Sequence, residues 1–82
     1  MAKRCFLIYH VTMSSTYKMI RLVGTSATSF EDAVQSAITE ASHSLKGLNW
    51  FEVKEQHGKI NEQGKVVEWQ VVLDVAFKIM KT

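Results

Sequence analysis

The stretch KVVEWQVVLDVAFKIM, residues 65–80, alternates with a period of two along its whole length. Its odd positions from Val67 to Ile79 are all apolar, whereas its even positions mix apolar, polar and charged residues. That alternation is typical of a β-strand with one buried face, and the continuous apolar face has to be covered. The run contains no proline, so we expect a central strand of a sheet.

Two further strands are expected upstream of this run. Residues 48–60 carry Phe51 and Val53 on one parity, with Trp50, Glu52, Lys54 and Gln56 on the other. The sequence NEQG at residues 61–64 is typical of a turn and would join this strand to the last one. Residues 17–23, YKMIRLV, also have the composition of a strand, which the GTS that follows should end.

Between the first two strands the apolar period changes to that of a helix. Ser29 and Asp32 form the S-x-x-D start of a capping box, and Gly47 follows Lys46 as a stop signal. The sequence therefore predicts a helix over residues 30–46. Its apolar residues form a single stripe: Phe30, Ala33, Val34, Ala37, Ile38, Ala41 and Leu45.

The order strand, helix, strand, strand predicts an α+β fold, a two-layer β-α-β-β unit. We expect a three-stranded antiparallel sheet packed on one helix, with the long C-terminal strand in the centre. Parity places Trp69, Val71 and Leu73 under the helix, and likewise Phe51 and Val53. Trp50 and Gln70 then point away from the helix.

The face that the helix leaves open carries the strongest functional signal in the sequence. A tryptophan beside other apolar residues on an open sheet face favours either a subunit interface or a platform for a flat ligand. From the residues alone, the interface is the more frequent use of such a tryptophan.

Composition limits the class of protein. The 82 residues (9.3 kDa) allow one small domain, which without disulfides often needs oligomerisation for stability. The net charge of +2 comes from Lys3 and Arg4, and the remaining eight basic residues balance the eight acidic ones, which argues against nucleic-acid binding. Cys5 is the only cysteine, and no apolar run is long enough to span a membrane.

Residues 1–15 form an N-terminal arm ahead of this patterned domain. Three interpretations stay open: a weak signal peptide, a disordered or edge segment, or an upstream start ahead of a natural start at Met13. We expect a cytoplasmic protein.

Four segments together resemble the dodecin family: TYKMIRLVGTS, SFEDAVQSAI, LNWFEVKE and EWQVVLDVAFK, spread over residues 16–78. The resemblance implies that residues 16–82 form a dodecin-like flavin-binding domain. It implies subunits that assemble into a hollow homododecamer, bind FMN or riboflavin and are not enzymes in the usual sense.

The resemblance also implies roles for individual residues. Trp50 would stack on the isoalloxazine ring, two flavins lying between two symmetry-related tryptophans, and Gln70 would hydrogen-bond the pyrimidine edge. Glu55 would lie near the ribityl chain. His57 stands where bacterial members often carry a phosphate-binding arginine, a departure that bears on the preference for FMN. Lys78 is a candidate contact for phosphate or coenzyme A.

The chemistry of the Trp50 and Gln70 side chains suits flavin binding. A tryptophan face gives a flat, electron-poor ring a large stacking area, and an amide offers both a donor and an acceptor to its polar edge. The function expected is flavin storage or sequestration with quenched photochemistry. The alternatives are a ligand-free structural or protein-interaction oligomer that uses the Trp50 face, and a flavin-dependent oxidoreductase. His10, His43 and His57 are scattered, so no metal site is predicted.

Overall fold

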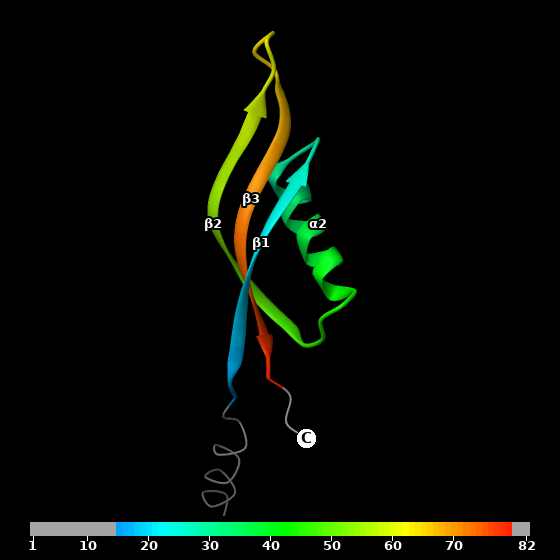
Figure 1. Cartoon of the computed structure of the whole chain (residues 1–82), viewed down its shortest axis with the longest axis vertical. Helices are drawn as coiled ribbons and strands as arrows, with labels where there is room; N and C mark the ends of the chain where they lie inside the picture. Colours follow the sequence, from blue (N-terminus) through cyan, green and yellow to red (C-terminus); the bar gives the residue numbers. More distant parts are fainter. Residues whose placement is uncertain (1–14, 80–82) are drawn as a thin grey trace, which may run out of the picture.

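The computed structural model describes residues 15–79, which form one sheet and one helix. Strand β1 (Tyr17–Ser26) leads to helix α2 (Phe30–Ser42), and strands β2 (Leu48–Ile60) and β3 (Val66–Lys78) follow as a long hairpin (Figure 1). The arm expected over residues 1–15 falls almost entirely outside the described residues. Among the described residues no helix is long and apolar enough to cross a membrane.

The sheet has the predicted topology. Its order is β1-β3-β2, and β3 is antiparallel to both neighbours. Leu73 in the centre of β3 lies opposite Leu22 of β1 and Val53 of β2. The α+β, β-α-β-β fold with a central C-terminal strand is therefore confirmed.

Helix α2 begins as the sequence predicts but ends earlier. Ser29 is the N-cap, and its side chain accepts a hydrogen bond of 3.0 Å from the backbone N–H of Asp32. The prediction of a helix to residue 46 is wrong, because α2 ends at Ser42. The N–H groups of His43 and Ser44 bond to carbonyls three residues back, which tightens the chain into a turn. Gly47, with φ 79°, then turns the chain into β2.

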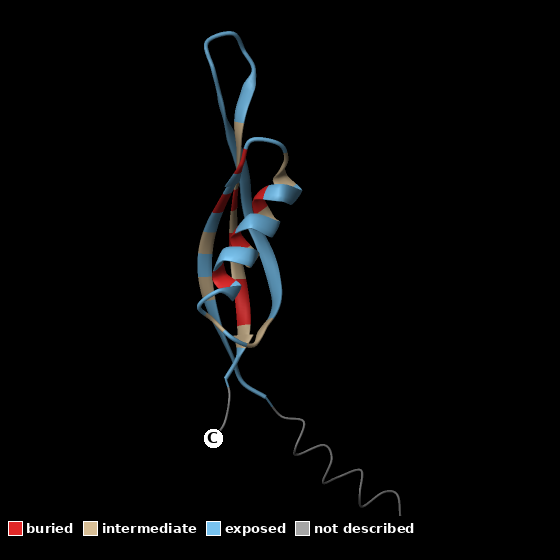
Figure 2. Cartoon of the chain, turned by 90° about the vertical axis from the view of Figure 1, so that its right-hand side faces the viewer, coloured by how far each residue is buried: buried red, intermediate tan, exposed pale blue. Residues whose placement is uncertain are grey.

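The core lies between α2 and the central strand. Val71, Leu73 and Val75 are almost completely buried, as their parity predicts, and they pack against Ala33 and Ala37 of the helix (Figure 2). Trp69 lies on the same side but is only partly buried, so the expectation that it is a core residue is only partly met. Its ring packs edge-to-face on Phe30 at a centroid distance of 4.9 Å.

The helix covers β1 and β3 and leaves β2 largely open. As a result Phe51 and Val53, predicted to face the helix, are 47% and 39% exposed. Helix and sheet approach closely at Gly24, where a Cβ atom would lie 2.2 Å from the carbonyl oxygen of Ala33. Only glycine allows that contact.

Strand β2 is irregular in a way that the sequence pattern does not indicate. Its register against β3 shifts between Leu48 and Trp50, between Val53 and Glu55, and again near the end of the hairpin. At the second shift Lys54 has no partner in β3, the mark of a β-bulge. Because side chains alternate along a strand, one extra residue reverses the faces of all residues that follow. Gln56, expected on the open face, therefore lies on the helix side opposite Val71.

The β2–β3 hairpin continues beyond the N-terminal end of α2 and stands free of it (Figure 1). Its turn is the predicted one: the N–H of Gly64 donates to the carbonyl of Asn61 at 3.0 Å, and Gly64 has φ 81°. Every residue from Ile60 to Val67 is exposed.

Candidate functional site

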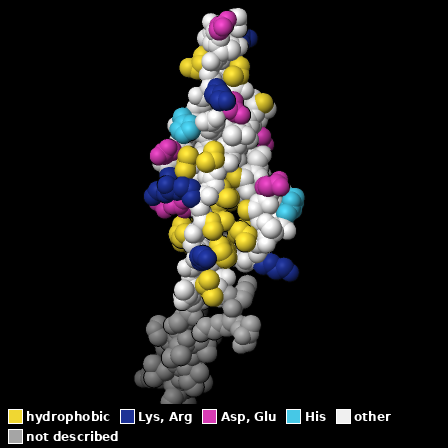
Figure 3. Space-filling model, in the orientation of Figure 1, with side chains coloured by type: hydrophobic (Ala, Val, Ile, Leu, Met, Phe, Trp, Pro, Cys, Tyr) yellow, Lys and Arg dark blue, Asp and Glu magenta, His cyan; other side chains and the backbone are white. Residues whose placement is uncertain are grey.

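The open face of the sheet carries Trp50. This residue lies opposite Ala76 of β3, an even position on the face turned away from α2. The bulge before it lets Leu48 pack on the core while Trp50 points the other way. The indole is 47% exposed although Ala76 beside it is buried. In the space-filling view, which has the orientation of Figure 1, the side of the sheet turned away from α2 lies at the left and carries charged and histidine side chains as well as hydrophobic ones (Figure 3). A half-exposed indole on an open sheet face is a suitable stacking platform.

Gln70 lies on the same face but far from Trp50. It is opposite His57 of β2 and Thr25 of β1, whereas Trp50 is opposite Ala76. Six residues of β3 separate the two positions, which at about 3.3 Å per residue is roughly 20 Å. Within one chain, Trp50 and Gln70 are therefore too far apart to contact the same ring system.

Glu55, predicted near the ribityl chain, and His57, at the position of a phosphate-binding arginine, both lie at the Gln70 end. The bulge at Lys54 turns Glu55 and His57 onto the open face, opposite Val72 and Gln70. His57 Nε2 lies 3.7 Å from Glu55 Oε1, and both side chains are largely exposed. Gln70 donates from Nε2 to Glu68 Oε1 at 2.9 Å. The Gln70 end thus combines an amide, two carboxylates and an imidazole.

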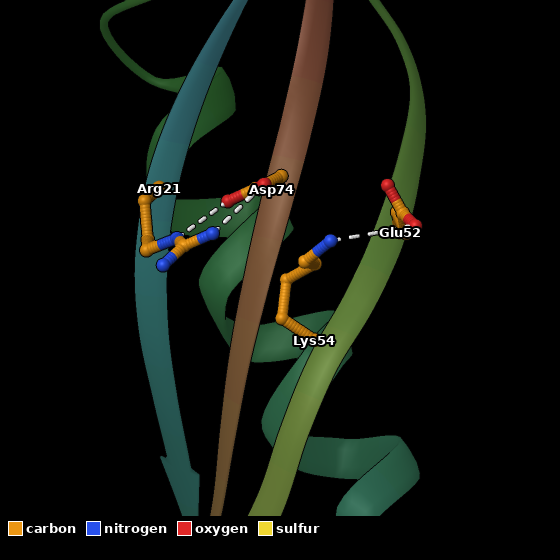
Figure 4. Close-up of polar contacts among 4 residues, drawn as sticks. All are labelled: Arg21, Glu52, Lys54 and Asp74. Atoms are coloured by element: carbon orange, nitrogen blue, oxygen red, sulfur yellow. Dashed lines mark hydrogen bonds and ion pairs between the residues drawn. The ribbon is translucent and has the colours of Figure 1, made fainter.

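A row of charges separates the two ends (Figure 4). Arg21 of β1 binds Asp74 of β3 through two hydrogen bonds, Nε to Oδ1 at 2.7 Å and Nη2 to Oδ2 at 3.1 Å. Lys54 Nζ lies 3.7 Å from a carboxylate oxygen of Glu52 on β2. The hydrogen bond from Arg21 holds the pKa of Asp74 below its ordinary value, and the charges of Arg21 and Lys54 act in the same direction. Sequence reasoning did not single out this row, although Arg21 and Asp74 both break an apolar pattern.

Lys78 lies at the Trp50 end. It is an exposed even position at the end of β3, opposite Tyr17 and two residues beyond Ala76. Its backbone N–H is held by the carbonyl of Gly47 at 3.0 Å. Trp50 and Lys78 therefore share one end of the face, and Gln70, Glu55 and His57 share the other. Within residues 15–79 no group of three or more histidine, cysteine, aspartate or glutamate side chains is arranged to hold a metal ion.

The fold and the site define a small β-α-β-β chain with a half-exposed tryptophan on its open sheet face, and comparison with known proteins identifies its family. The family model for dodecin matches residues 16–80. The dodecin of Thermus thermophilus is 49% identical over 70 residues, covering 85% of this chain and all of that protein. The chain belongs to the dodecin family.

Other relatives agree in sequence and structure. The calcium dodecin of Mycobacterium tuberculosis is 35% identical over 65 residues, covering 79% of this chain and 90% of that one. The structure of dodecin from Streptomyces coelicolor is 38% identical with a TM-score of 0.79, and covers 85% of this chain and 99% of that one. A crystal structure of a Thermus thermophilus protein is 48% identical with a TM-score of 0.78, covering 84% and 100%. These likenesses confirm the family that the four sequence segments resemble.

Proposed function

We propose that this chain stores or sequesters flavin, FMN or riboflavin, by stacking the isoalloxazine ring on Trp50 in a hollow homododecamer. The observation that carries the proposal is the half-exposed indole of Trp50 on the sheet face turned away from α2. Membership of the dodecin family supports it, since small-molecule binding and assembly into dodecamers are properties of that family. A ring sandwiched between indoles leaves little access for a second reactant, so we propose a binding protein and not an enzyme.

The site is proposed to be shared between subunits. Trp50 and Gln70 are separated by six residues along β3, roughly 20 Å at the usual rise of a strand, which is longer than an isoalloxazine ring. A flavin stacked on Trp50 would therefore take its edge hydrogen bonds from Gln70 of another copy. Pairs of flavins between two-fold-related indoles fit this arrangement, because a two-fold axis brings the same residue from both copies together.

The polar residues Glu55, His57 and Lys78 are proposed to contact different parts of the ligand. Glu55, beside Gln70 on the open face, would accept hydrogen bonds from ribityl hydroxyls. His57 would contact a phosphate only weakly, because an imidazole lacks the permanent charge of an arginine and the paired N–H donors of its planar guanidinium. Lys78 at the Trp50 end is the candidate for phosphate, and coenzyme A is a further candidate ligand there. Cytoplasmic location stays a prediction from the sequence.

Replacing the tryptophan tests the proposal. In Trp50→Ala we expect flavin affinity to fall by about 5- to 150-fold, since stacking of a flat ring on an aromatic side chain is worth about 1–3 kcal/mol, while light scattering shows the oligomer unchanged. Val23→Ala, which shortens another exposed apolar side chain opposite Val72 on the same face, is the matched control and should bind normally. If Trp50→Ala loses the oligomer instead, the ligand-free structural alternative is supported.

Mixed assemblies test whether the site is shared. Trp50→Ala and Gln70→Ala chains would each bind weakly alone. When the two are dissociated, mixed equally and reassembled, about one site in four would regain an intact tryptophan and glutamine if these come from different copies. Strong binding by Gln70→Ala alone, or no recovery in the mixture, would show that the shared site is wrong.

A further inference from the structure

A groove runs between α2 and β2 on the helix side of the sheet. It exists because α2 packs on β1 and β3 and leaves β2 uncovered. Its volume is about 890 Å³. Its apolar lining includes Val34, Ile38, Phe51 and Val53. Phe51 and Val53 remain 47% and 39% exposed, so this α2/β2 groove is an apolar surface that nothing within residues 15–79 covers.

The charged part of the α2/β2 groove is acidic. Among the described residues that line it, the charged ones are Glu31 and Asp32, both in the first turn of α2. Asp32 already accepts a hydrogen bond from Ser26 Oγ at 2.7 Å. Glu31 takes part in no ion pair within residues 15–79. A segment that suits this groove therefore combines apolar side chains with positive charge.

The N-terminal arm has that composition. Lys3 and Arg4 stand directly before the apolar run CFLIY at residues 5–9, and no aspartate or glutamate occurs in the chain before Glu31. The family model for dodecin begins its match at residue 16, so the arm is an addition to the part of the chain that the family shares. The arm and the groove are thus complementary in both charge and hydrophobicity.

The arm begins close enough to reach the groove. The N–H of Ile79 bonds to the carbonyl of Thr16 at 2.9 Å, so the arm joins the sheet at the end of β3. From Ile79 to Val75, which lies opposite Phe51, is four residues of β3, roughly 13 Å, and two strand spacings add about 10 Å. The eleven residues from Cys5 to Thr16 can span up to roughly 36 Å. The surplus lets the arm pass around the connection between α2 and β2, which lies at the same end of the sheet (Figure 1).

The order of residues in the arm matches the order of features along the groove. Phe51 lines the end nearer the start of the arm, and Glu31 lines the far end, at the beginning of α2. From Phe51 to Gln56 is five residues of β2, roughly 16 Å, which is the span of about five extended residues. An arm that enters at Phe51 would lay residues 5–9 along the apolar lining and bring its two basic residues to Glu31.

We propose that residues 3–9 of the N-terminal arm dock in the α2/β2 groove of their own chain, with the apolar run on β2 and the basic pair beside Glu31. The docked arm would cover the apolar side chains that one helix leaves exposed. The inference rests neither on flavin binding nor on assembly, and it leaves the Trp50 face to the ligand.

Disulfide trapping with the native Cys5 tests this contact in the full-length chain. Gln35→Cys places a second thiol in the groove lining, and Ser36→Cys, the next exposed position of α2 but outside the lining, is the matched control. On mild oxidation Gln35→Cys should lose both thiols and keep the mass of one chain on a non-reducing denaturing gel. Peptide mapping should find Cys5 joined to the introduced thiol. Ser36→Cys should form its bond about fivefold more slowly, or slower still, because docking raises the effective concentration of Cys5 only at the groove.

Charge variants test the acidic end of the groove. In the Gln35→Cys background, Glu31→Lys should slow trapping by about two- to fivefold, the range for an exposed ion pair. Adding Lys3→Glu and Arg4→Glu reverses both sides of the contact and should restore the rate. Glu40→Lys, an exposed position of the same helix outside the groove, is the control and should leave the rate unchanged.

Three results would overturn the docked arm. Equal trapping rates for Gln35→Cys and Ser36→Cys would show that the arm meets the helix without a preferred site. Covalent dimers as the main product would show that a second copy, and not the chain's own arm, approaches the groove. An unchanged rate in Glu31→Lys would show that the basic pair does not lie there. None of these readouts involves flavin, so a failure here is distinguishable from a failure of the Trp50 site.

Discussion

Gly24 is a residue at which the fold leaves no room for a side chain. A Cβ atom there would lie 2.2 Å from the carbonyl oxygen of Ala33 and 3.0 Å from Cβ of Ala37, so the helix would have to move away from β1. We expect Gly24→Ala to lower the free energy of unfolding by about 1–3 kcal/mol, the range for overpacked cores. Urea unfolding at one fixed protein concentration measures this. Ser36→Ala on the exposed side of α2 should change stability by less than about 0.5 kcal/mol. Equal stability of the two variants would contradict the close approach.

The ion pair of Arg21 and Asp74 should make stability depend on acid pH. The hydrogen bond from Arg21 lowers the pKa of Asp74 below its ordinary 3.8, so the folded state favours the charged carboxylate. That stabilisation is fully present above the unfolded value and is lost as the pH falls through the lower folded value. Asp74→Asn should therefore be less stable than the native chain at pH 7, and the difference should shrink as the pH falls below 3.8.

Urea unfolding at pH 7 and at several values below pH 4 measures that difference. Glu62→Gln, at the hairpin turn and outside the ion pairs of the described residues, serves as the control and should give a pH-independent difference. A constant gap between Asp74→Asn and the native chain at every pH would show that the ion pair does not contribute.

At the scale of the element, the bulge at Lys54 in β2 decides which side chains of that strand lie on the open face. Removing Lys54 restores strict alternation, so residues 55–60 must either change faces or shift their register against β3. Glu55 and His57 would then turn towards the helix side of the sheet, or the hairpin would lose its pairing. We expect deletion of Lys54 to weaken both assembly and flavin binding, as seen by light scattering and by flavin titration. Lys54→Gln keeps the extra residue and should retain both, and a deletion variant with native assembly and affinity would contradict the role of the bulge.

Sequence periodicity accounts for the elements but not for their irregularities. The alternation of β3 and the stripe of α2 each report burial against a partner, so the order of elements and the burial of Val71 and Leu73 follow from them. A bulge depends on which residue of a neighbouring strand lies opposite, which the pattern of one strand does not contain. For the same reason the alternation placed Gln56 on the wrong face, and only resemblance to the family pointed to Glu55 and His57.

At the scale of the molecule, one chain buries a small core and leaves many large apolar side chains exposed. The largest fully buried side chains are Leu73, Val71 and Val75, a small core for a long sheet with one helix. Trp50, Phe51 and Ile60 all leave apolar area in water. Sequence could indicate that Trp50 points outward, but the separation of Trp50 from Gln70 became clear only from the strand register. That separation is the reason to place the ligand between copies.

Titration of riboflavin into the purified full-length protein, followed by flavin fluorescence and light scattering together, tests the central claim most directly. Electron transfer from a stacked indole should quench the emission, and with two flavins between two indoles the titration should end near one flavin per chain. Trp50→Ala, assembled to the same mass, should leave the emission almost unchanged at the same concentrations. Full flavin emission in the presence of excess native oligomer would contradict a flavin site on Trp50.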